Sequence, residues 1–482
     1  MNTFIKSSLL LFGILGFAGC APLPAKSPQQ PEIIKPELQQ TLASVAGESA
    51  FEHSARPVAA WWNGFNDKVL DDLVDMALRG NPTLAAAQAR IEQAGHVTRL
   101  VELTSGIRYN SDALLTRQHL SANGIFPPPL GGSTLNMGDM SVGASYALDW
   151  WGKNRSLLQS AVGENKAAEA EHGAAKLALV GEVTDAYFSW QEIAACVKLA
   201  RQAVEKRRMA SQLAALRLKR GIDSALVSSQ MDVLLAQEQD NLKDLETQSK
   251  ILRDRLAALT GNGPDWGAKL AEPVQSSAGA FPLSPELHGK LPLDLLANRP
   301  DLIALQWRAE AAGSRIEGAK ADFYPNVDLN LLVGLQSIDL ANWLRAKSRY
   351  ASFGPAVHIP LFNVGTLRNN LGMREAEYAE SVAQYNQSLL TAASQVADAL
   401  TRVASFEERE QLQRAATVSA ERSQHLQTRR FERGLSDRLP ALDGEIATLA
   451  QHARESKLQA DRKRAMASLY MALGGGYESN QE

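Results

Sequence analysis

The chain has 482 residues, and its 50 lysines and arginines nearly balance its 53 aspartates and glutamates, for a formal net charge of −3. This balance excludes the strongly basic surface that binds nucleic-acid phosphates, so no nucleic-acid partner is expected. A hydrophobic content of 45% excludes a wholly disordered chain, and two cysteines exclude a disulfide scaffold and a cysteine-rich zinc site. No metal or other cofactor is expected.

Residues 1–20 have the pattern of a bacterial lipoprotein signal peptide. Lys6 precedes an apolar run over residues 9–17, and two small residues stand directly before Cys20. This arrangement resembles a lipobox, in which the cysteine thiol receives a diacylglycerol and the cysteine becomes the new amino terminus. We therefore predict that Cys20 is lipidated. The alternative is an ordinary signal peptide with an incidental cysteine.

The segment after Cys20 is predicted to be a tether with little core of its own. Residues 21–57 contain six prolines, a composition typical of extended linkers. Ala21 directly after the cysteine resembles the sorting pattern for the outer membrane. After residue 20 no apolar run is long enough for a transmembrane helix.

The rest of the chain is predicted to be a tandem duplication. Helix-opening motifs stand at Asn81-Pro82-Thr83-Leu84 and at Arg299-Pro300-Asp301-Leu302. At a constant offset of 213 residues, Gly152, Asp185 and Arg220 recur as Gly365, Asp398 and Arg433. We predict a first repeat over residues 58–290, a second over 291–475 and a short tail over 476–482. Each repeat is expected to contain a helix, a β-hairpin and a long helical hairpin.

Two long segments without proline, residues 152–220 and 366–433, predict the first helices of these hairpins. At 1.5 Å per residue, each would be about 100 Å long, which no compact domain needs. Gly221 and Gly434 follow as C-cap residues, and the next residues have side chains typical of N-caps. The chain is therefore expected to reverse into antiparallel helices over residues 224–259 and 436–473.

Four segments alternate between apolar and polar residues with a period of two: residues 107–116, 141–150, 326–336 and 352–361. Each is long enough for a tilted strand across a bilayer. A soluble half-buried sheet has the same alternation, but small polar faces and aromatic residues near the strand ends favour the membrane. Residues 121–136 are expected to form an extracellular loop. Because four strands cannot close a barrel, other copies must complete it, in a number that the pattern leaves open.

Several motifs, in this order, resemble the TolC-type outer-membrane efflux factors, in the lipoprotein branch that serves drug-efflux pumps. They are Trp61-Trp62, Phe65-Asn66-Asp67, residues 146–152 (YALDWWG), Leu291-Pro292, Arg299-Pro300-Asp301-Leu302, Phe323-Tyr324-Pro325 and residues 360–365 (PLFNVG). The resemblance implies a mixed α and β membrane protein that forms a homotrimer. Four transmembrane β-strands per protomer would close a twelve-stranded β-barrel, and the long helical hairpins would form a periplasmic α-barrel.

The same resemblance implies a function, a set of partners and a location. The protein would be the exit duct of a tripartite efflux system, passively conducting drugs or other small toxic compounds across the periplasm and outer membrane. Its partners would be a periplasmic adaptor (membrane fusion) protein and an inner-membrane transporter of the resistance-nodulation-division or a related class. It would be lipid-anchored in the bacterial outer membrane and extend into the periplasm.

By resemblance, the helix tips dock the adaptor and surround the closed aperture. The tip residues that match the family pattern are Arg220, Gly221, Ser224, Arg433, Gly434 and Ser436. The family often carries acidic residues that ring the aperture just inside the second tip, and Asp443 is the best match to them, so it is the candidate aperture gate. Three symmetry-related carboxylates near an axis would repel each other and attract cations. The alternative is that Asp443 only complements the dipole of a helix N-terminus.

No enzymatic activity is expected, because the chain has no metalloprotease, phosphate-loop or serine-hydrolase motif. Two other functions remain open. One is an outer-membrane duct for polypeptide secretion, which uses the same fold with a different inner-membrane partner. The other is a periplasmic coiled-coil adaptor without a pore. Two hairpins, each tied to amphipathic strands, favour a duct over an adaptor.

Overall fold

The computed structural model describes residues 32–34, 59–273 and 298–477, which form two compact units. One unit is built mainly from residues 90–169 and 304–385, and the other mainly from 59–89, 170–273 and 386–477. Each unit therefore draws on both halves of the predicted duplication. The predicted signal peptide, Cys20 and nearly all of the predicted tether lie outside the described residues. Within the described ranges, no helix has both the length and the apolar character needed to cross a membrane.

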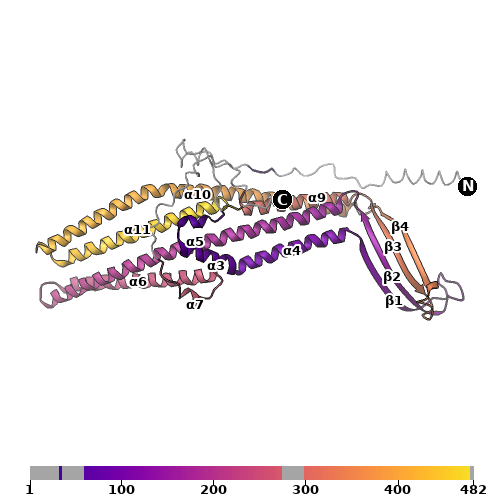
Figure 1. The fold of residues 1–482 in the computed structure, drawn as a ribbon, viewed down its shortest axis with the longest axis horizontal. Coiled ribbons are helices and arrows are strands. Elements are labelled where there is room, and N and C mark those ends of the chain that lie inside the picture. The colour runs from indigo at the N-terminus through magenta and orange to yellow at the C-terminus, as the bar shows by residue number, and fades with distance from the viewer. Residues whose placement is uncertain (1–31, 35–58, 274–297, 478–482) are drawn as a thin grey trace. The chain divides into compact units, whose positions relative to one another are not determined.

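The first unit contains the four predicted strands, paired as one antiparallel sheet in the order β1-β2-β3-β4 (Figure 1). Their bounds are Arg108–His119 for β1, Thr134–Leu148 for β2, Asn326–Ser337 for β3 and Arg349–His358 for β4. The expected loop over 121–136 is too long, because Thr134–Asn136 pair with Arg117–His119 and so belong to β2. Strand β4 ends before the predicted residue 361, near Pro360, which has no N–H to donate to a ladder.

The pairing register gives the sheet one apolar and one polar face. Val142 stands opposite Ser111 and Val333, while Leu331 stands opposite Ala144 and Phe353. Residues directly opposite one another share a face, so these side chains line one side of the sheet. Most of its large apolar side chains are exposed: Leu115, Val142, Leu331, Val333, Phe353 and Val357. The other face carries Asp112, Asp139, Asn330 and Ser352.

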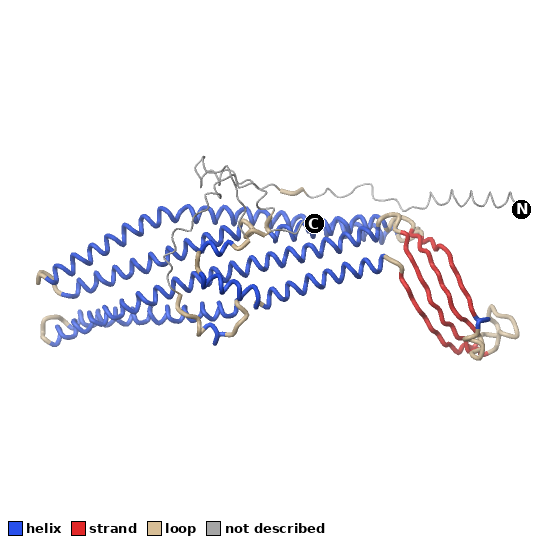
Figure 2. Tube along the Cα trace, in the orientation of Figure 1, coloured by secondary structure: helices blue, strands red, loops and turns tan. Residues whose placement is uncertain are grey.

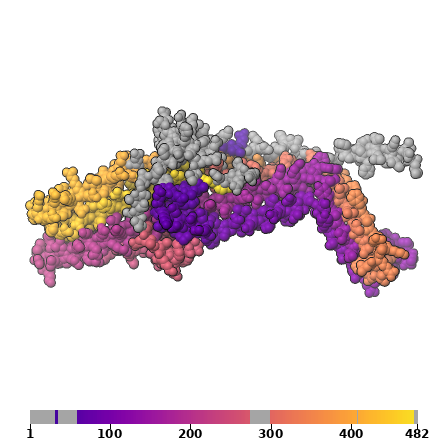
Figure 3. All heavy atoms as spheres, in the orientation of Figure 1, coloured from indigo at the N-terminus to yellow at the C-terminus, as the bar shows by residue number. Residues whose placement is uncertain are grey.

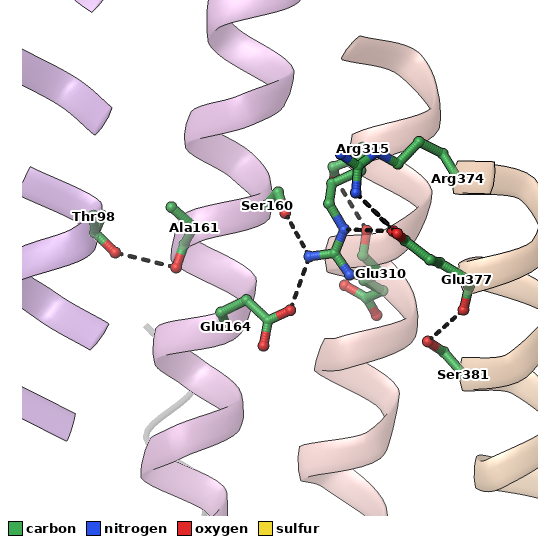
Figure 4. A network of polar contacts seen from close by, with 10 residues as sticks. Thr98, Ser160, Ala161, Glu164, Glu310, Arg315, Arg374, Glu377 and Ser381 are labelled. Carbon is green, nitrogen blue, oxygen red and sulfur yellow. Dashed lines mark hydrogen bonds and ion pairs between the residues drawn. The ribbon is translucent and has the colours of Figure 1, made fainter. Parts of the chain in front are cut away.

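Helices pack in the first unit through polar contacts as well as apolar ones (Figure 4). The helices that contribute are α4 (Pro82–Ser105), α5 (Lys153–Lys219), α9 (Pro300–Ala321) and α10 (Val364–Glu432). Arg315 on α9 donates from Nη1 to Glu164 on α5 at 2.9 Å, and its Nε lies 3.6 Å from Glu377 on α10. Thr98 on α4 donates to the carbonyl of Ala161 on α5 at 3.1 Å. These contacts join four helices side by side.

The second unit contains most of the two predicted helical hairpins, which the structure confirms (Figure 2). Helix α5 is followed by α6 (Ala225–Leu259), and α10 is followed by α11 (Arg438–Ala472). Space-filling atoms of the two hairpins, magenta to pink and orange to yellow in Figure 3, lie against each other toward their tips. The short elements η1 (Trp61–Phe65), α3 (Lys68–Gly80) and α7 (Pro264–Gly267) complete the unit.

The core of the second unit explains the aromatic motif near the start of the described chain. Trp61 stacks on Tyr470 with ring centroids 5.6 Å apart, and Phe65 packs edge-on against Phe188 at 4.8 Å. Asp67 then caps α3 by accepting from the Val69 amide. The motif thus combines a buried aromatic anchor with a helix N-cap.

The Pro-containing motifs of the two halves hold helix ends in the same way. Asn81 donates from Nδ2 to the carbonyl of Leu259 at 2.8 Å, at the end of α6. Arg299 donates from Nη1 to the carbonyl of Ala472 at 3.2 Å, at the end of α11. In each case, the residue before the proline satisfies a carbonyl that the helix itself leaves without a partner.

Candidate functional site

The candidate site lies at the tips where α5 turns into α6 and α10 turns into α11. Gly221 and Gly434 both have φ of +69°, a left-handed conformation that favours glycine. The Gly221 amide donates to the Leu218 carbonyl and the Ile222 amide to the Arg217 carbonyl, both at 2.9 Å. The second tip repeats this pattern from Gly434 and Leu435. Both tips are therefore Schellman C-caps, which require glycine for its backbone freedom.

The two tips differ in how the second helix begins. Ser224 occupies the N-cap position of α6 without a side-chain cap bond. At the other tip the N-cap is Asp437, whose carboxylate accepts from the Leu439 amide at 2.8 Å. The helix predicted to start at Ser436 thus starts at Arg438, because the aspartate is the capping residue. Among the expected docking residues, Arg220 and Arg433 are exposed.

One arginine that the sequence analysis missed joins the two tips. Arg217, in the last turn of α5, places Nε 2.8 Å from Asp223 Oδ2 and Nη1 2.8 Å from Asp437 Oδ2. Hydrogen bonds to Asp437 and Asp223 raise the pKa of Arg217, so the guanidinium stays charged. Because Asp437 also caps α11, this arginine fixes the start of one hairpin's second helix against the other hairpin.

A second layer of ion pairs lies further along the helices and contains Asp443. Its Oδ1 is 2.6 Å from Nη1 of Arg207 on α5; the Asp443 side chain is 54% exposed and that of Arg207 14% exposed. Beside this pair, Glu445 contacts both Lys206 and Arg438. Asp443 lies beyond the first turn of α11, so complementing the helix dipole is a minor role for it.

Ion pairs in these two layers connect the first helical hairpin to the second. Carboxylates on or near α11 meet cations on α5, so the charges hold the two hairpins of one chain together. Charged hydrogen bonds of this kind are stronger than neutral ones when partly buried. Across the described residues, no group of three or more His, Cys, Asp and Glu side chains is arranged to hold a metal ion.

The fold defines the class of protein: long helical hairpins combined with a four-stranded antiparallel sheet are the architecture of outer-membrane channels of the efflux type. The family model for outer membrane efflux proteins matches residues 73–262 and 291–475, and the chain belongs to this family. The predicted family, fold class and channel function are confirmed.

Individual relatives agree with this assignment. The multidrug resistance outer membrane protein MdtP of Escherichia coli is 31% identical over 493 residues, which cover 98% of this chain and 97% of the relative. The outer membrane protein VceC of Vibrio cholerae is similar in structure, with a TM-score of 0.78, 30% identity and coverage of 88% and 100% of the two chains. The Campylobacter jejuni CmeC outer membrane channel, 19% identical, has the same fold, with a TM-score of 0.82 and 96% coverage of both chains.

Proposed function

We propose that this outer-membrane channel is the passive exit duct of a tripartite efflux system, conducting drugs or other small toxic compounds. The multidrug resistance relatives support this substrate class. The observation that carries the proposal is the sheet, which has one exposed apolar face, one polar face and two edge strands. In this proposal the chain has no enzymatic activity, and the energy for transport comes from the inner-membrane partner.

The sheet edges support a homotrimer. In hydrocarbon, each unpaired backbone group costs several kcal/mol, so β1 and β4 must find partners. The strands alternate in direction, so β4 of one copy is antiparallel to β1 of the next, as a closed sheet requires. Three copies would close a twelve-stranded barrel with the apolar face toward lipid and the polar face toward a water-filled lumen.

The tips support the docking of a periplasmic adaptor. They expose the guanidinium groups of Arg220 and Arg433 next to the apolar side chains of Ile222, Leu226 and Leu435. An exposed apolar cluster rimmed by charge is typical of a protein-binding surface. The adaptor would connect the duct to a transporter of the resistance-nodulation-division or a related class.

Asp443 supports a gate close to these tips. Its carboxylate is more than half exposed although it pairs with Arg207, so part of it remains available to water and ions. In a trimer, breaking this pair would release the second hairpin from the first and widen the aperture. The predicted diacylglycerol on Cys20 would anchor the amino terminus in the outer membrane.

The test is single-channel conductance in planar bilayers together with the mass of the purified oligomer. Two neighbouring residues of β3 provide a matched pair: Leu331 on the apolar face and Asn330 on the polar face. Leu331→Arg should cost about 2–4 kcal/mol per protomer in a membrane and abolish channels. Asn330→Arg should retain a trimeric channel with reduced cation selectivity. A wild-type protein that forms no trimer and no channels would refute the duct.

A further inference from the structure

Figure 2 shows the β1–β2 and β3–β4 loops together at one end of the sheet, and four basic residues belong to the strand ends and loop at this end. Arg117 is near the end of β1, and Arg349 is the first residue of β4. Arg345 and Lys347 lie in the loop that leads into β4, around the short helix η3 (Ala346–Ser348). All four side chains are exposed.

None of these four cations has a carboxylate partner among the described residues. The Arg349 Nε donates to the Ala346 carbonyl at 2.9 Å, which fixes the guanidinium without neutralising it. The acids near this end are engaged elsewhere. Asp139 accepts from Gln336 at 3.0 Å and from the Tyr350 hydroxyl at 3.2 Å, on the polar face of the sheet. Asp339 accepts from the amides of the β3–β4 loop.

The register places two of the cations on the apolar face. Arg349 stands opposite Leu335, and Arg117 is two residues beyond Leu115 on the same side of β1. Trp343 covers this face as well, because a Cβ on Gly138 would lie 2.5 Å from its ring. The Trp343 indole donates to the Leu335 carbonyl at 3.1 Å. An aromatic ring and arginines at the end of an apolar band are typical of a membrane–water interface.

We propose that Arg117, Arg345, Lys347 and Arg349 form a collar that binds the phosphate groups of anionic lipids in the outer leaflet. This inference rests on the proposed channel function, which places the apolar face in the bilayer and the loop end outside the cell. Charge complementarity identifies the ligand. Lipid phosphates are the negative groups at the membrane–water interface, and a guanidinium group binds a phosphate through two parallel hydrogen bonds.

Trimer closure would strengthen the collar at each junction. Arg117 lies on the edge strand β1 and Arg349 on the edge strand β4. When β4 of one copy pairs with β1 of the next, the loop ends of both strands meet. Neighbouring strands are about 4.8 Å apart and both arginines face the apolar side, so closure brings cations of two protomers to the same junction. Each junction then becomes a site that a single chain does not form.

The experiment titrates the full-length detergent-purified protein with bisphosphorylated lipid A and counts bound lipid by native mass spectrometry. The double variant Arg117→Gln/Arg349→Gln is compared with Arg108→Gln/Arg368→Gln. The control removes two exposed arginines that lie toward the opposite end of the sheet. Each cation near an anionic headgroup changes affinity by about fivefold, so the collar variant should bind about 25-fold more weakly than the control.

Two further measurements separate the explanations. Dephosphorylated lipid A should bind both variants equally and weakly, and the collar variant should keep wild-type conductance in planar bilayers, because Arg117 and Arg349 lie on the face away from the proposed lumen. Conducting trimers with reduced lipid binding support the collar. Equal binding of bisphosphorylated lipid A by both double variants overturns the collar but leaves the channel in place. Displacement of the lipid by an equal concentration of inorganic phosphate would also overturn it, because the ligand would then be free phosphate.

Discussion

The Arg207–Asp443 pair gives the sharpest prediction about gating. Asp443→Ala removes a carboxylate 2.6 Å from a guanidinium that is only 14% exposed. A partly exposed ion pair contributes up to about 1 kcal/mol, and here the arginine would also be left without its acid. At about 1 kcal/mol per protomer, the closed state loses about fivefold in population relative to the open state. If the three protomers open together, the ratio changes about 100-fold.

Open probability and conductance of single channels in planar bilayers measure this change directly. Asp443→Ala should open the channel, and Asp443→Asn, which keeps an oxygen acceptor for Arg207, should have a smaller effect. Asp240→Ala is the matched control, because Asp240 is exposed on α6 and has no ion pair among the described residues. Closed channels in Asp443→Ala, or equal opening in Asp240→Ala, would refute the reasoning.

Three further predictions concern stability and anchoring. The Tyr187 hydroxyl donates to Asp67 at 2.7 Å, and burial raises the pKa of Tyr187. The contribution of this hydroxyl to the free energy of unfolding is therefore complete below pH about 10, where unfolded tyrosine is also protonated, and falls as the pH rises above it. Tyr187→Phe should therefore cost about 1–2 kcal/mol in guanidinium unfolding at pH 8, and the difference from wild type should vanish near pH 11; a constant difference would contradict this origin. Gly434→Ala should lower the free energy of unfolding by about 1 kcal/mol, because its φ is positive and no neighbour would touch the added Cβ. Gly434→Asn should recover part of this loss, and equal losses in the two variants would contradict the backbone explanation. Cys20→Ala should abolish incorporation of labelled fatty acid in cells, whereas retained label would show that the lipid is elsewhere.

Local patterns predicted most of the architecture because helices and strands have different periods. Proline-free segments predicted α5 and α10 almost to the residue, and alternation predicted the four strands. Errors occurred at the ends. Thr134–Asn136 were predicted as loop but pair with β1, and the helix predicted to start at Ser436 starts at Arg438, after its cap Asp437. Both depend on which partner a backbone group finds, which local composition does not show.

The sequence by itself determined the hairpins, their glycine turns and the amphipathic strands, because each follows from neighbours within a few residues. Only the tertiary structure decided which charges meet. Arg207 and Asp443 are 236 residues apart, and Arg217 and Asp437 are 220 apart, so no periodicity links them. The basic collar likewise required the strand register, which places Arg117 and Arg349 on the apolar face. These residues meet because distant segments pack against each other in the tertiary structure. Periodicity among neighbouring residues does not show which distant segments will pack together.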